Sequence, residues 1–174
     1  MTFASLSGWQ FDTDADAGRT MRRMASNVHR ALSASVYSPA VIKLANRIIA
    51  GATPRDTVAQ VVAIRDWLDS RFRYVNDPLG VELLRDPISM FAEIKGQGFT
   101  QGDCDEAAVM AAILGMANGI PVRFRALAFY RPDAPFSHVV ADLQTSTGWA
   151  PIDITKPVNM EVPPVATRTL IQAV

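Results

Sequence analysis

The sequence is poor in the residues on which disulfide-bonded domains and zinc proteins depend. It contains one cysteine and two histidines, which excludes an intramolecular disulfide and any Cys-rich zinc site. Its charges balance, with 17 Lys plus Arg against 17 Asp plus Glu, so the basic surplus typical of a dedicated nucleic-acid-binding protein is missing. We therefore expect no metal, no cofactor and no nucleic-acid partner.

Long hydrophobic runs are also missing. No stretch of about 18 apolar residues occurs, so we expect no membrane span. The first ten residues have neither the basic segment nor the apolar segment of a secretory signal peptide, and we expect the chain to be cytoplasmic on synthesis. At 49% apolar residues the chain can nevertheless build a sizeable core, and its length suits one domain.

The first half of the sequence has the pattern of amphipathic helices separated by turns. Apolar residues recur at spacings of three and four over residues 18–34, which is the period of one helix face. Three later segments begin with Ser, Thr or Asp followed by proline, the residues that cap and open helices. We predict helices over residues 18–34, from Ser38 to Gly51, from Thr53 to about Phe72, and from Asp86 to the loop at Gly96–Gly98.

The second half changes character. Residues 104–117 are apolar beyond their first turn, which indicates a helix packed on several sides, and Asn118–Gly119 ends it. The β-branched and aromatic residues that follow predict strands. We expect these strands over residues 122–130, 138–144 and 149–155, and we predict no element for the tail after Pro157.

The only cysteine lies at the start of the apolar helix, within Gly102-Asp103-Cys104-Asp105-Glu106. Asp103 is a candidate N-cap, and Glu106 completes an acidic capping box. Cys104 then falls in the first turn, where free backbone N–H groups and the positive helix end stabilise a thiolate. The neighbouring carboxylates oppose this, so an activated thiol needs a cation nearby, usually a histidinium.

His138 and Asp153 lie on two strands that we expect to form a hairpin. If Gln144 is opposite Trp149, Asp153 lies diagonal to His138; with a two-residue turn, the two face each other directly. In either register both side chains project from the same face of the sheet. Asp153 can then orient His138, and His138 can meet Cys104 if the helix start packs against this sheet. That is the logic of a nucleophile, a base and an orienting carboxylate.

Three segments follow one another along the second half of the chain: Gly102–Ala108 with Gly119–Arg123, Ser137–Val139 and Gly148–Thr155. In this order they resemble the motifs of the transglutaminase-like superfamily. In the last motif Ile154 replaces a proline that is common in the family. The upstream segment Phe72–Glu82 also resembles the corresponding segment of stand-alone family members from phages and prophages. The resemblance covers roughly residues 54–157.

The resemblance implies an α+β, papain-like fold in which a Cys-bearing helix packs on an antiparallel sheet, with N-terminal helices added. It gives Cys104, His138 and Asp153 the roles of a catalytic triad that cleaves amide bonds through a thioester. Water would then make the protein a peptidase or amidase, and an amine would make it a transglutaminase. Gln97 and Gln101 are candidate donors to the oxyanion, beside the Cys104 backbone N–H.

The resemblance also suggests the organisation of the chain, its substrates and its partners. We expect an N-terminal extension over residues 1–50, a catalytic core over residues 51–160 and a tail over residues 161–174. The expected substrates are peptide, protein or cell-wall amides, and the expected partners are phage structural proteins, with incorporation into a virion as one possible destination. The alternative is a non-enzymatic phage morphogenetic or tail protein that retains the fold.

Overall fold

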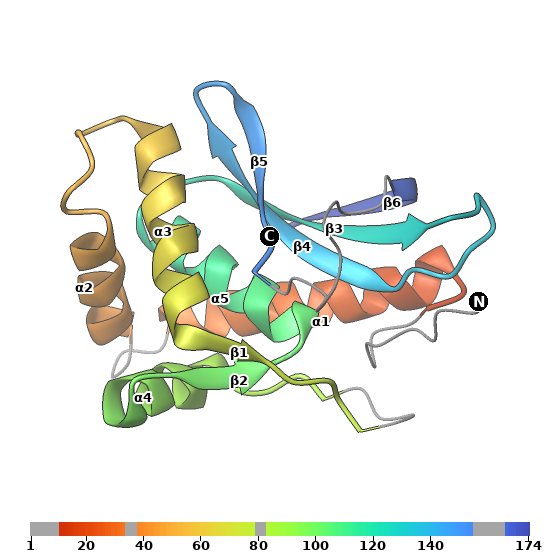
Figure 1. Cartoon of the computed structure of the whole chain (residues 1–174), viewed down its shortest axis with the longest axis horizontal. Helices are drawn as coiled ribbons and strands as arrows, with labels where there is room; N and C mark the ends of the chain where they lie inside the picture. The colour runs from red at the N-terminus through yellow and green to blue at the C-terminus, as the bar shows by residue number, and fades with distance from the viewer. Residues whose placement is uncertain (1–10, 34–37, 79–82, 155–165) are drawn as a thin grey trace.

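The computed structural model describes residues 11–33, 38–78, 83–154 and 166–174 (Figure 1). Residues 1–10 of the expected N-terminal extension, where the sequence suggests an extended arm, lie outside the described residues. The described residues form helices in the first half of the chain and mainly strands in the second. In chain order the elements are α1 (Asp14–Ser33), α2 (Ser38–Ile48), α3 (Thr57–Arg71), β1 (Phe72–Tyr74), α4 (Pro87–Gln97), β2 (Thr100–Gly102), α5 (Cys104–Ala117), β3 (Val122–Phe129), β4 (His138–Thr145), β5 (Gly148–Ile152) and β6 (Ala166–Ala173).

The signals that predicted α4 are the ones that form its ends. Asp86 is the N-cap, because its side chain accepts a hydrogen bond from the Ser89 backbone N–H at 3.1 Å. Pro87 occupies the first turn, where a missing N–H is tolerated. The helix ends at Gly98, whose φ of 89° lies in the left-handed region that favours glycine.

α3 starts later than the sequence predicted. The Thr53–Pro54 pair lies in a turn ahead of the helix, and Arg55 there has a φ of 70°. Asp56 is the true N-cap, since its side chain accepts from the Ala59 backbone N–H at 3.0 Å. The prediction was wrong because the aspartate two residues after the proline is the better capping residue for the positions that follow.

Four strands form an antiparallel sheet in the order β5–β4–β3–β6. β3, β4 and β5 are the three predicted strands. Gln144 pairs with Trp149 across the β4–β5 hairpin, which is the first of the two registers considered. β6 was not predicted; it pairs with β3 at the other edge of the sheet and alternates half-buried with exposed residues.

α5 is the centre of the molecule. Every residue from Cys104 to Gly115 is buried, as expected of a helix packed on several sides. The helix lies against β4 and β3 on one side and against α1 on another. At Gly115 an added Cβ would lie 2.8 Å from a Leu143 side-chain carbon and 3.0 Å from one of Val122. The absence of a side chain there allows the helix to approach the sheet this closely.

The remaining helices, α2, α3 and α4, gather at one end of the molecule (Figure 1). Two short strands run beside them: β1 follows α3 directly and pairs in parallel with β2. β2 in turn leads into the first residue of α5. This small parallel pair, which the sequence did not predict, therefore adjoins the end of α5 that carries Cys104.

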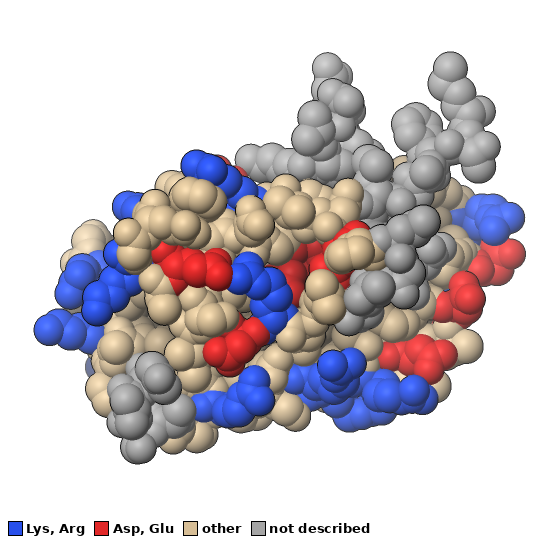
Figure 2. All heavy atoms as spheres, turned by 90° about the horizontal axis from the view of Figure 1, so that it is seen from below, with Lys and Arg blue, Asp and Glu red and all other residues tan. Residues whose placement is uncertain are grey.

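Charged side chains of both signs are interspersed on the face shown in Figure 2. Within the described part of the chain, no helix combines the length and hydropathy needed to cross a membrane.

Candidate active site

Cys104 lies at the first position of α5, and the predicted capping box is present. The Asp103 side chain accepts a hydrogen bond from the Asp105 backbone N–H at 3.1 Å, and the Glu106 side chain accepts one from the Asp103 backbone N–H at 2.9 Å. Cys104 itself is only 1% exposed. Its backbone is thereby fixed at a helix start, where N–H groups lack helical partners and the helix end is positive.

His138 and Asp153 are brought together by the β4–β5 hairpin. Nε2 of His138 lies 2.8 Å from Oδ2 of Asp153. Because an ionised carboxylate can only accept, this contact assigns the proton to Nε2 and makes Nδ1 the basic nitrogen of the neutral ring. The ring centroid of Phe129 lies 6.4 Å from that of His138 on the neighbouring strand. The imidazole is therefore oriented by a carboxylate and has an aromatic neighbour.

The phenol of Tyr74 is affected by charge at both Cys104 and Asp153. It is the last residue of β1, pairs with Gly102 and is half-buried. Burial raises the pKa of its phenol, and negative charge at Cys104, Asp103 and Asp153 raises it further. Electrostatic effects of this kind require short separations. Tyr74 therefore lies within the electrostatic influence of both Cys104 and Asp153, and its phenol stays protonated at neutral pH.

Sequence reasoning did not identify Tyr74. The residue belongs to a strand of three residues, too short to show an alternating pattern. Its place in the site depends on pairing with β2, which lies 28 residues further along the chain at Gly102. No local signal encodes that pairing, although an aromatic residue just after a helix could have been marked as a candidate.

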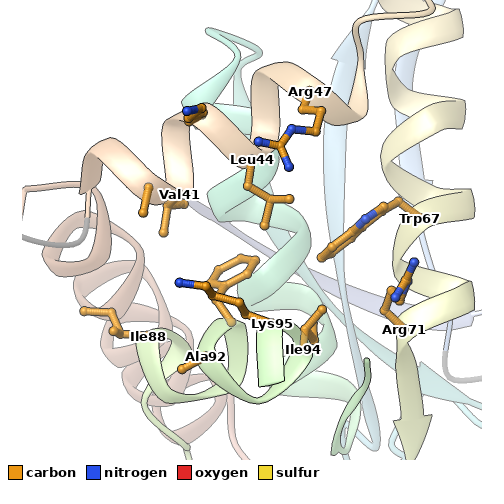
Figure 3. Close-up of a pocket in the computed structure, with 12 residues that line it drawn as sticks. Val41, Leu44, Arg47, Trp67, Arg71, Ile88, Ala92, Ile94 and Lys95 are labelled. Carbon is orange, nitrogen blue, oxygen red and sulfur yellow. The ribbon is translucent and has the colours of Figure 1, made fainter. Parts of the chain in front are cut away.

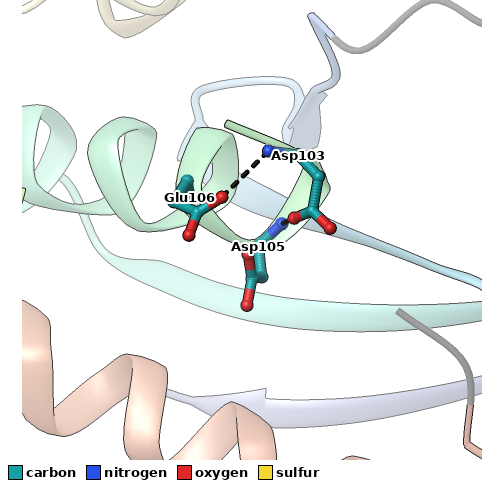
Figure 4. A group of neighbouring side chains, drawn as sticks. All are labelled: Asp103, Asp105 and Glu106. Atoms are coloured by element: carbon teal, nitrogen blue, oxygen red, sulfur yellow. Dashed lines mark hydrogen bonds between the residues drawn. The ribbon is translucent and has the colours of Figure 1, made fainter. Parts of the chain in front are cut away.

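Three carboxylates gather beside Cys104 (Figure 4). Asp103, Asp105 and Glu106 are each at most 1% exposed. Burial raises the pKa of Glu106 to about 7. The hydrogen bonds that its carboxylate accepts from the backbone N–H groups of Arg85 and Asp103 lower the pKa but do not offset burial. At neutral pH this side chain is partly protonated, which reduces the negative charge at the start of α5.

The same three side chains form the group of described residues whose ligand atoms are close enough to share a cation, within 4.8 Å of one another. Their oxygens are also used structurally. Oδ1 of Asp103 and Oε2 of Glu106 accept the backbone N–H groups that define the helix cap. The capping box therefore accounts for Asp103 and Glu106 without a metal, and we assign no ion to this group.

The two glutamines proposed as oxyanion donors lie at the end of α4 and in β2. Gln97 is the last residue of α4, and its side-chain amide donates to the Phe99 carbonyl at 3.2 Å. Gln101 is exposed and central in β2, between the buried Thr100 and Gly102. Side chains alternate along a strand, so Gln101 projects from the opposite face to Gly102, the residue that pairs with Tyr74. The Gln101 side chain is thus on the opposite face of the β1–β2 pair from Tyr74, and the Gln97 amide is used at the end of α4.

Comparison with known proteins places the fold. Residues 42–154 match the family model described as the transglutaminase-like superfamily. No curated protein matches the sequence.

Two solved structures share the fold. A candidate protease from Parabacteroides distasonis superposes with a TM-score of 0.54 at 14% identity, over 75% of this chain and 25% of its own. A candidate cysteine protease from Cytophaga hutchinsonii gives the same TM-score at 21% identity, over 76% of this chain and 42% of its own. This chain therefore spans less than half of the length of either protein. With a family match over well more than half of its residues, the chain belongs to the transglutaminase-like superfamily.

Proposed function

We propose that the protein is a cysteine-dependent acyltransferase or hydrolase of amide bonds, with Cys104, His138 and Asp153 as its catalytic triad. The observation that carries this proposal is the 2.8 Å contact between His138 and Asp153. Charge at Asp153 and charge at Cys104 both raise the pKa of Tyr74, which supports a common site. A nucleophile at a helix start, a strand-borne base and an orienting carboxylate are the three parts that such chemistry requires.

The proposed reaction follows from the positions of these groups. Nδ1 of His138 takes the proton of the Cys104 thiol, and the sulfur attacks the amide carbonyl carbon to give a tetrahedral oxyanion. The imidazolium then returns the proton to the leaving amine as the C–N bond breaks, which leaves a thioester. Water or a second amine, deprotonated by the same imidazole, attacks the thioester and releases Cys104. Asp153 holds the ring in the productive tautomer throughout.

The oxyanion needs hydrogen-bond donors beside the sulfur. The Cys104 backbone N–H is one donor by its place at the helix start. We propose Tyr74 as the second, because its phenol keeps its proton and lies near the thiol. Gln97 and Gln101 remain the candidates from sequence, and a comparison of Tyr74→Phe with Gln101→Ala in one assay separates the two assignments. Tyr130→Phe, at an exposed tyrosine, is the control.

The fold neighbours favour peptide or protein amides as substrates, since both are described as candidate proteases. Cell-wall amides stay a second substrate class from the sequence. The phage association, whether as a virion enzyme or as a non-enzymatic structural protein, also stays a prediction, because no comparison adds to it. A protein with the fold but no reactive thiol would favour the non-enzymatic alternative.

Acylation of Cys104 tests the proposed function. We expect the parent protein, incubated with an activated acyl ester, to gain one acyl group at Cys104 by intact-mass and peptide mass spectrometry. We expect it also to cleave at least one amide in a panel of peptide and cell-wall substrates. Cys104→Ser should lose both reactions by a factor of about 10³ or more while keeping the parent's circular dichroism spectrum. Undiminished turnover by Cys104→Ser, or no acyl adduct on the parent, would contradict the proposal.

A further inference from the structure

A cavity lies between α2, α3 and α4 (Figure 3). Its volume is about 580 Å³, which is within the range of pockets that hold small organic molecules. Neither Cys104, His138, Asp153 nor Tyr74 lines it. We call it the three-helix cavity, and the argument below does not depend on the proposed function.

The wall of the three-helix cavity is apolar on all three sides. Val41 and Leu44 contribute from α2, Trp67 from α3, and Ile88 and Phe91 from α4. Phe91 is buried, whereas Leu44, Trp67 and Ile88 are half-buried. Burying this remaining apolar surface under a ligand would be favourable at roughly 25 cal/mol per Å². The wall is therefore suited to a hydrocarbon chain or ring.

Four cations surround this apolar wall, and they come from each of the three helices. Lys43 and Arg47 lie one turn apart on α2, Arg71 is at the end of α3, and Lys95 is on α4. No carboxylate is among the described residues that line the cavity. Arg71 donates to the Gly98 carbonyl at 3.3 Å, which uses one of its five N–H groups.

The charge of these cations is not balanced locally. Among the described residues, Lys43, Arg47 and Lys95 form no ion pair. Elsewhere in the described chain arginines commonly do, as Arg65 does with Asp66 at 2.7 Å on α3. An apolar wall ringed by unbalanced cations is complementary to a ligand with an apolar body and an anionic group.

We propose that the three-helix cavity binds a small amphiphilic carboxylate, with its apolar part against Trp67 and Leu44 and its carboxylate at the cationic rim. Arginine matches a carboxylate in a two-pronged geometry, which favours this head group. The alternative occupant, an acidic amphipathic helix of a partner protein, is distinguished from a carboxylate by the test below.

Dodecanoate, used below its micelle concentration, is the probe. We expect it to bind the full chain with one site by calorimetry and to change tryptophan fluorescence, and we expect Trp67→Phe to remove most of that change. Dodecyltrimethylammonium, with the same chain and the opposite charge, should bind at least about tenfold more weakly. The paired substitution Lys43→Gln with Arg47→Gln should weaken dodecanoate by about tenfold, whereas Arg65→Gln on the outer part of α3 should leave it unchanged.

Several results would overturn this inference. They are equal affinity for the anionic and the cationic probe, the same loss in Arg65→Gln as in the paired variant, and no dodecanoate binding at all. Tight binding of an acidic amphipathic peptide at this cavity in the absence of dodecanoate binding would also overturn it, in favour of a protein partner. Ala92→Trp, which adds bulk from an exposed position of the lining, should abolish binding without loss of the folded circular dichroism signal.

Discussion

Burial raises the pKa of the Glu106 carboxyl. The free energy of unfolding should therefore depend on pH. The pKa of this carboxyl is about 7 in the folded chain against an ordinary 4.5. Because the folded state holds the proton more tightly, the contribution of this group is fully present below about pH 4.5 and is lost as the pH rises through about 7. We expect the urea midpoint of the parent to fall over that range for this reason.

Glu106→Gln tests this linkage. The variant loses one of two acceptors, since an amide accepts only through its oxygen, and should be less stable at every pH. Its midpoint should nevertheless depend less on pH between about 4.5 and 7 than that of the parent. Asp66→Asn, at an exposed residue, is the control and should follow the parent. Parallel curves for the parent and Glu106→Gln would show that this carboxyl titrates normally.

At the residue scale, the sequence predicts what local chemistry determines. Asp103, Cys104 and Glu106 form a capping signal within four residues, and the structure contains it. Tyr74 could not be predicted in the same way, because its neighbours come from β2, α5 and the end of β5. The position of Asp153 beside His138 was predictable only because a short hairpin fixes its register.

At the scale of elements, two helical glycines should respond to alanine in opposite directions. At Gly115 of α5 an added Cβ would come within 2.8 Å of Leu143, whereas at Gly96 of α4 nothing lies within 4 Å. Gly96→Ala should raise stability by about 0.5–1 kcal/mol through helix propensity. Gly115→Ala should lower it by about 1–2 kcal/mol, because overpacking exceeds the same gain in propensity.

Thermal or urea unfolding of both variants measures this difference. An equal gain in both would mean that α5 can move away from β4 at little free-energy cost, and that the close packing of the helix on the sheet does not fix its position. The comparison is informative because both residues are helical glycines without a positive φ.

The strands that were not predicted from the sequence, β1, β2 and β6, escaped prediction for a common physical reason. β1 and β2 have three residues each, and β6 follows a segment without a strand pattern and alternates weakly at the sheet edge. Their pairings are non-local: β6 pairs with β3 from Phe129↔Ala166 to Arg123↔Ala173, across more than thirty-five residues of chain. Periodicity detects elements that bury one face over many residues, such as α1. Apolar or β-branched composition detects elements that are mostly buried, such as α5 and β4.

At the scale of the whole molecule, the candidate site is assembled from distant parts of the chain. The thiol is on α5, the imidazole at the start of β4, and the carboxylate just beyond β5. The family match over residues 42–154 includes all three. We propose that the fold places the start of α5 against this hairpin, and the central claim to test is that His138 acts on Cys104.

The pH dependence of Cys104 alkylation measures that action directly. The reagent is iodoacetamide, and the rate of each variant is scaled to its own maximum because the thiol is buried. The parent should react appreciably already at about pH 6, well below the free-thiol midpoint of about 8.5. His138→Ala should raise the midpoint by about one unit or more, to about 8.5 or higher, because the carboxylates then act unopposed. His29→Ala, at the exposed histidine of α1, should match the parent. One midpoint near 8.5 in all three proteins would contradict the account.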